Sequence, residues 1–230
     1  MSTHPADAMP PAGGTVPPVP EPEFEVLGVR PLRHAAAPTL LLDLRISETE
    51  GRPVYMIALT VQVMIEPARR SYDEDAHRRL AGLFGPPERW AVTTRSLVWA
   101  QLDVVVPAFT GSTTVAVPIS CSYDLELAAA KYLRSISDGV APLALHFNGV
   151  VYYPNDAGGL QMVLIPWSRS IDFRMPVEVW SETVKHYYPN TGWVGLRSET
   201  IDALEQRRVE GAHATMDDCI RGLLSEGGDD

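Results

Sequence analysis

Cysteine and lysine are scarce in this chain of 230 residues. The two cysteines, Cys121 and Cys219, are far apart and belong to no Cys-x-x-Cys pair, so the sequence predicts neither a disulfide framework nor a zinc site. The only lysines are Lys131 and Lys185. With 19 basic and 29 acidic residues the net charge is −10, which repels phosphate backbones and argues against nucleic-acid binding.

Long apolar runs are also missing. No window approaches the roughly 20 apolar residues of a membrane-spanning helix, and the start of the chain lacks the basic and apolar regions of a signal peptide. We therefore expect a cytoplasmic protein without a membrane span. Because 45% of the residues are hydrophobic, the chain has enough apolar material for a sizeable core.

The composition divides the chain into three parts. Residues 1–22 contain seven of the 20 prolines, and such a composition cannot bury enough apolar surface to fold, so we expect a disordered tail. A main body over residues 23–176 and a C-terminal appendage over residues 177–230 follow. The appendage has 11 acidic and five basic residues, a net charge of −6, so we expect any protein partner at this element to be basic.

Apolar and polar residues alternate through most of the main body, which is typical of half-buried strands. The alternation is clearest over residues 40–46 and 55–65, after a first strand that begins at Phe24. Five further strands are expected over residues 94–106, 113–121, 141–153, 160–167 and 170–175. About eight strands without regularly interposed helices favour an antiparallel β-sandwich over a parallel sheet.

Helical spacing appears within the main body and again in the appendage. Ser71 and Glu74 form a capping box before an apolar stripe, which predicts a helical insertion at about residues 68–90. The appendage is expected to hold roughly three short helices, the last of them behind a capping box of Thr215 and Asp218.

The order of motifs in the main body resembles the water-stress and late-embryogenesis-abundant domain. The segment Phe109–Pro118, which reads Phe-Thr-Gly-Ser-Thr-Thr-Val-Ala-Val-Pro, precedes Ser122-Tyr123-Asp124-Leu125, and Phe173-Arg174-Met175-Pro176 closes a long hairpin. The resemblance covers about residues 23–67 and 101–176. It implies an immunoglobulin-like (fibronectin III-like) β-sandwich, to which the helical insertion and the C-terminal helical appendage are additions.

Over its full length the chain also resembles a family of high-GC Gram-positive bacteria that has no established activity. Segments that carry this resemblance are Glu88-Arg89-Trp90, the run Thr-Thr-Arg-Ser-Leu-Val-Trp over residues 93–99, and Leu143–Gly149. Members of that family tend to be encoded beside nickel-iron hydrogenase genes. The resemblance implies an accessory protein with hydrogenase subunits or maturation proteins as partners, and it transfers no catalytic residue.

Motifs with catalytic or cofactor-binding spacing are absent from the sequence. There is no Gly-x-Ser-x-Gly elbow, P-loop or Gly-x-Gly-x-x-Gly, and the six histidines never approach a metal-binding spacing. We therefore predict no catalytic, cofactor-binding or metal-binding residues and no cofactor. An unrecognised hydrolase or metal protein stays as an alternative, because distant residues such as His146, His186 and a thiolate can converge in a fold.

Aromatic residues concentrate in the insertion and the appendage, the two regions foreign to a plain sandwich. Tryptophan and tyrosine are common in interface hot spots because they bury much area at little entropic cost. The same side chains can instead fasten the appendage to the sandwich. The candidate partner surface consists of Trp90, Trp180, His186, Tyr187, Tyr188 and Trp193.

The sequence therefore supports two functions. The first is a non-catalytic interaction or assembly protein associated with a nickel-iron hydrogenase, with the sandwich as its scaffold. The second is an independent stress-protective or ligand-binding β-sandwich, as the water-stress resemblance implies. The sequence leaves the oligomeric state open.

Overall fold

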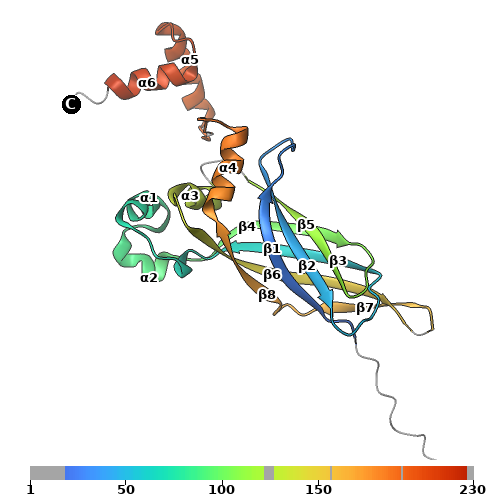
Figure 1. Cartoon of the computed structure of the whole chain (residues 1–230). Coiled ribbons are helices and arrows are strands. Elements are labelled where there is room, and N and C mark those ends of the chain that lie inside the picture. The colour runs from blue at the N-terminus through green and yellow to red at the C-terminus, as the bar shows by residue number, and fades with distance from the viewer. Residues whose placement is uncertain (1–18, 122–126, 156, 193, 227–230) are drawn as a thin grey trace, which may run out of the picture.

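The computed structural model describes residues 19–121, 127–155, 157–192 and 194–226 of the chain (Figure 1). Strands account for most of the regular structure in these residues. In chain order they are β1 (Pro22–Pro31), β2 (Thr39–Glu48), β3 (Met56–Ile65), β4 (Leu97–Val106), β5 (Ser112–Ser120), β6 (Val140–Pro154), β7 (Leu160–Ile165) and β8 (Ser170–Pro176).

The described residues also form six α-helices, which lie in the insertion and towards the C-terminus. They are α1 (Glu74–Phe84), α2 (Trp90–Thr93), α3 (Ala128–Ser135), α4 (Val177–Tyr187), α5 (Ser198–Glu210) and α6 (Met216–Glu226). Single 3-10 turns at Pro67–Arg69 and Pro87–Arg89 precede α1 and α2. No helix in this part of the chain is both long and apolar enough to cross a bilayer.

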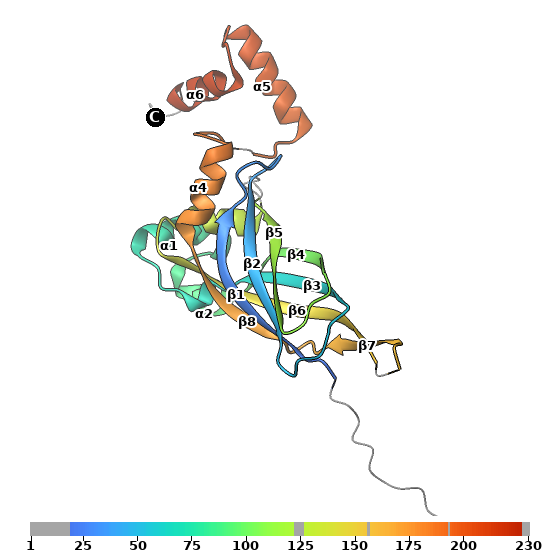
Figure 2. The same ribbon diagram turned by 45° about the vertical axis from the view of Figure 1, so that its right-hand side comes forward.

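The strands form two sheets that pack face to face (Figures 1 and 2). One sheet has the order β1-β2-β5, and the other has the order β4-β3-β6, with β7 and β8 both paired to the far edge of β6. Every strand pair is antiparallel. The chain is therefore mostly β and forms an antiparallel β-sandwich, as the alternation predicted.

The core lies between the two sheets and follows the alternation closely. The inward residues of β2 and β3 are fully buried, namely Leu40, Leu42, Leu44, Ile46, Ile57, Leu59, Val61, Val63 and Ile65. Phe24 of β1 stacks on Phe147 of β6 with the ring centroids 4.2 Å apart, which joins the two sheets. The alternation over residues 55–65 places Tyr55 on the same face as Ile57, which predicts that it is buried. This prediction is wrong, because β3 begins at Met56 and Tyr55 before it is exposed.

Helices α1, α3 and α4 close one end of the sandwich, where Leu80, Leu133 and Trp180 join the core. The start of α1 differs from the prediction. Asp73, and not Ser71, caps this helix, because its carboxylate accepts a hydrogen bond from the backbone N–H of Ala76 at 2.7 Å. Serine and aspartate are both favoured at the N-cap, so the sequence alone could not decide which of the two residues begins the helix.

Strand β6 has 15 residues and two different halves. Residues 141–145 are buried on both faces, while from Val150 onwards only one face is covered. Between the halves lies Gly149, whose φ of 146° is open only to glycine. A Cβ built there would lie 2.1 Å from the carbonyl oxygen of Ala58 on β3, so this position requires glycine for space as well as for conformation.

Gly149→Ala is expected to lower the free energy of unfolding by about 2–4 kcal/mol, because it adds backbone strain to a clash with Ala58. Gly82→Ala is the matched control, since Gly82 lies in α1 with open space at its Cβ position and alanine raises helix stability by up to about 1 kcal/mol. Chemical denaturation of both variants measures the difference. Equal stabilities would contradict the close approach of β6 to β3.

Candidate functional site

Trp90 lies in an aromatic cluster within the insertion. Its ring centroid is 5.3 Å from that of Tyr72, 5.5 Å from that of Phe84 and 4.6 Å from that of His77. The indole N–H donates to the carbonyl of Gly85 at 2.8 Å. With its polar atom satisfied and its ring half-buried, Trp90 holds α1 and α2 together.

A tyrosine pair connects this cluster to α3. The Tyr72 hydroxyl donates to the carbonyl of Pro67 at 2.7 Å and lies 2.9 Å from the Tyr132 hydroxyl. Because the one proton of Tyr72 is directed to Pro67, Tyr132 acts as the donor between the two hydroxyls. Burial raises the pKa of both hydroxyls above the ordinary tyrosine value, so both are harder to ionise than a tyrosine in water.

Helix α4 is fastened to the sandwich by Trp180 and Tyr187. Trp180 is only 4% exposed and packs into the core. The Tyr187 hydroxyl donates to the carbonyl of Leu32 at 2.8 Å and accepts from the backbone N–H of Ala35 at 2.9 Å, both in the connection between β1 and β2. His186, beside Tyr187, is exposed. The first turns of the appendage are thus part of the sandwich's own packing.

A cavity of about 540 Å³ lies between α3, α4 and the loop that follows α4. Tyr188 lines it together with the basic side chains of Arg134 and Lys185. The nearly buried side chains of Leu133 and Trp180 also line it. A lining that combines apolar side chains with two cations suits a small anionic ligand with an apolar body.

The structure does not bring the six predicted partner-surface residues together. Trp90 lies in the insertion, Trp180 in the core, and Tyr187 in a hydrogen-bonded contact with the sandwich. His186 is exposed, Tyr188 lines the cavity, and Trp193 lies outside the described residues.

Helices α5 and α6 form a hairpin beyond α4, which we call the helical arm (residues 198–226). Its main contacts are between the two helices, and it extends away from both sheets in Figures 1 and 2. The predicted capping box of Thr215 and Asp218 at the start of α6 is confirmed. The Thr215 hydroxyl accepts a hydrogen bond from the backbone N–H of Asp218, and the Asp218 carboxylate accepts one from the backbone N–H of Thr215. The only buried residue of the arm is Cys219.

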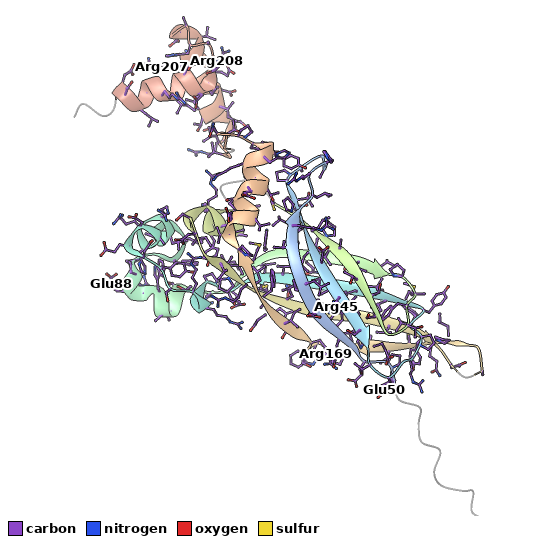
Figure 3. The ribbon with its side chains drawn as sticks, in the orientation of Figure 1. Arg45, Glu50, Glu88, Arg169, Arg207 and Arg208 are labelled. Atoms are coloured by element: carbon purple, nitrogen blue, oxygen red, sulfur yellow. The ribbon has the colours of Figure 1, made fainter. Side chains whose placement is uncertain are left out.

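The arm's acidic charge is largely uncompensated. It has seven acidic and three basic residues. All three arginines form ion pairs within the arm, Arg207 with Glu226, Arg208 with Glu205, and Arg221 with Asp217. Figure 3 shows Arg207 and Arg208 on the arm, away from Arg45 on the sandwich. Glu199, Asp202 and Glu210 form no ion pair within the described residues.

A second exposed feature lies at the other end of the molecule, on the outer side of the five-stranded sheet. Eight uncharged apolar residues form this outer apolar face: Met56, Ala58, Val105, Val150, Tyr152, Leu160, Met162 and Leu164. Met162 and Leu164 of β7 are 70% and 73% exposed. At the opposite end of β6 the corresponding positions, Pro142 and Ala144, are covered.

The sequence pointed to the acidic appendage as the place for a basic partner, but it did not separate the arm from α4. It did not single out the outer apolar face. A signal for the face exists, because the segment Leu160–Ile165 is apolar at five of six positions and so lacks the alternation of a half-buried strand. Such a strand has either two buried faces or one bare apolar face. For metal sites the structure adds one fact: the described residues contain no cluster of three or more His, Cys, Asp or Glu side chains placed to hold an ion.

The two cysteines are expected to differ in reactivity although both are buried. Burial raises the pKa of the Cys121 thiol to about 12, so at pH 8 it stays protonated and unreactive, whereas Cys219 becomes accessible whenever the small arm opens. Alkylation followed by mass spectrometry should label Cys219 at least about tenfold faster than Cys121. In denaturant both should react equally. Faster labelling of Cys121 in the native chain would contradict the greater stability of the sandwich.

Comparison with known proteins gives a family but no activity. No curated protein matches the chain. Among solved structures, a Bordetella pertussis protein assigned as ApaA is similar over 69% of this chain and 98% of its own, with 12% sequence identity and a TM-score of 0.23. The model of a family of unknown function, DUF6084, matches residues 19–230. This chain therefore belongs to the DUF6084 family.

Proposed function

We propose that this chain is a non-catalytic interaction or assembly protein of the cytoplasm, which binds its partner through the helical arm. The observation that carries the proposal is the arm's separation from the sandwich, since α5 and α6 pack mainly on each other. Apolar side chains that a closed fold would bury stay exposed on it, among them Ile201, Val209 and Leu224.

Physical chemistry argues that such an arm is stabilised by a partner. The two helices have 13 and 11 residues, lengths at which isolated helices are marginal in water. Packing against each other buries only Cys219 completely. A partner surface would cover Val209 and Leu224 and so supply the apolar burial that the hairpin itself lacks.

The charge of the arm indicates the chemistry of the partner. Because its arginines are already paired internally, the arm presents an acidic surface, and we expect a basic surface on the partner. Complementary charge mainly speeds association and fixes orientation, while apolar burial supplies the affinity.

A nickel-iron hydrogenase, as subunits or as maturation proteins, is the partner that we propose to test first. What supports this choice is the resemblance to bacterial proteins encoded beside hydrogenase genes, together with an arm suited to binding. The sandwich would act as scaffold. We assign it to the immunoglobulin-like, fibronectin III-like class because β1-β2-β5 and β4-β3-β6-β7 follow the A-B-E and C′-C-F-G order.

The cavity beside α4 favours the second candidate function, an independent stress-protective or ligand-binding module. Its lining includes the basic residues Arg134 and Lys185 together with apolar Leu133 and Trp180, which would suit a small organic anion. Under this alternative a deletion strain would be sensitive to drying while its hydrogen uptake stayed normal.

The full-length tagged chain is expected to copurify with hydrogenase subunits from a strain that makes the enzyme. The double variant Val209→Ala, Leu224→Ala should weaken binding about tenfold or more, because it removes the exposed apolar groups of the arm. Val92→Ala is the control, since Val92 is exposed to a similar extent, 74% against 68% for Val209, but lies in α2.

Two results would count against this proposal. One is a lack of any copurifying subunit combined with normal hydrogenase amount, assembly and activity in a deletion strain. The other is equal weakening by Val92→Ala and by the arm variant, which would place the contact outside the arm.

A further inference from the structure

The outer apolar face is large enough to form most of one side of a stable interface. From the exposure of its eight residues we estimate on the order of 500 Å² of apolar surface. The largest apolar patch on a monomer is about 300–600 Å², and a standard interface buries about 800 Å² on each partner. A polar rim that includes Thr60 and Asp103, which hydrogen-bond to each other at 2.6 Å, borders the face.

Strand β7 lacks the features that protect other sheet edges from association. The edge strands are β1, β4, β5, β7 and β8. Charged residues or proline occur in each of the others, such as Asp103 in β4, Pro118 in β5 and Arg174 in β8. By contrast, β7 reads Leu-Gln-Met-Val-Leu-Ile, with no charge, no proline and no register shift. The outward side chains of β7 therefore form an uninterrupted uncharged row, which can enter a face-to-face contact without burying a charge.

Large and small side chains are distributed on the outer apolar face so that two copies of it can fit together. The large side chains of Leu160, Met162 and Leu164 follow one another along β7, and we call them the ridge. Ala58, two strands away on β3, has the smallest side chain of the face, and we call its position the trough. A two-fold axis that lies in the interface, parallel to β6, would place the ridge of each copy over the trough of the other. In such an isologous contact the two sheets pack face to face with their strands roughly aligned.

Charge also favours a second copy at this place. Each copy has a net charge of −10, so approach through most surfaces is opposed by repulsion. None of the eight residues of the face is charged, so two copies can meet there without placing like charges in contact. An uncharged face also has no means of selecting a basic or acidic partner.

We infer that a second copy of this chain covers the outer apolar face, forming a symmetric dimer in which the β7 ridge of one copy packs against β3 of the other. The helical arms lie at the other end of each copy and stay free in this dimer. The inference goes beyond the proposed function and does not depend on it.

Sedimentation velocity of the full chain should show a dimer at concentrations on the order of 10 μM. Met162→Glu should weaken dimerisation by at least about 30-fold, because it buries two carboxylates in an apolar contact. Gln101→Glu is the matched control: it adds the same charge on the same sheet face, on β4 outside the apolar residues, and should leave the dimer intact. Because Met162 and Gln101 are both exposed, we expect both variants to fold, and circular dichroism checks this.

Two further measurements test the arrangement. Ala58→Phe adds apolar surface but fills the trough, so it should weaken the dimer about tenfold or more. Raising the salt concentration should strengthen the dimer, because salt screens the repulsion between two acidic copies. A monomer at this concentration, equal effects of Met162→Glu and Gln101→Glu, a stronger dimer with Ala58→Phe, or dissociation by salt would each overturn the inference.

Discussion

The length of strand β6 is the constraint on which the rest of the structure depends. Strand β6 has 15 residues, whereas β7 has six and β8 has seven. Both short strands therefore pair with the same edge of β6, one after the other along its length. The half paired with β8 is buried on both faces, partly by the first turn of the insertion, whereas the half paired with β7 is covered on one face only. Glycine at position 149 lets the strand pass close to β3 between these halves. One sheet therefore has a covered end and a bare end.

This asymmetry leaves two separate exposed surfaces, which we propose as association surfaces. At the covered end, Trp180 and Tyr187 fasten α4 to the sandwich, and α4 leads into an acidic helical arm with little core of its own. At the bare end, the outer apolar face is uncharged. Charge and burial thus differ between the two surfaces, which suits them to different partners: a basic protein at the arm and a second copy at the sheet. A scaffold with two such surfaces fits an assembly role.

Much of the sandwich could be predicted from the sequence, because alternation is a local property. The inward residues of β2 and β3 and the capping box of Thr215 and Asp218 were confirmed for this reason. The cap of α1 was wrong, since Ser71 and Asp73 are both good capping residues and only the path of the chain selects one. The candidate aromatic surface depended on which side chains the fold encloses, and composition cannot show that for Trp180. The outer apolar face depends on strand pairing across β3, β6 and β7, which involves residues more than 90 positions apart.

We propose above all that a partner binds the helical arm and stabilises it, and hydrogen exchange measures this directly. The full chain should be compared alone and with purified nickel-iron hydrogenase, with amide exchange followed along the whole sequence. In the free chain, residues 198–226 should exchange much faster than β2 and β3, because the arm has almost no buried core. With hydrogenase present, residues 198–226 should become protected, while exchange in β2 and β3 should not change. An arm as protected as the core in the free chain, or no added protection with hydrogenase, would contradict the account.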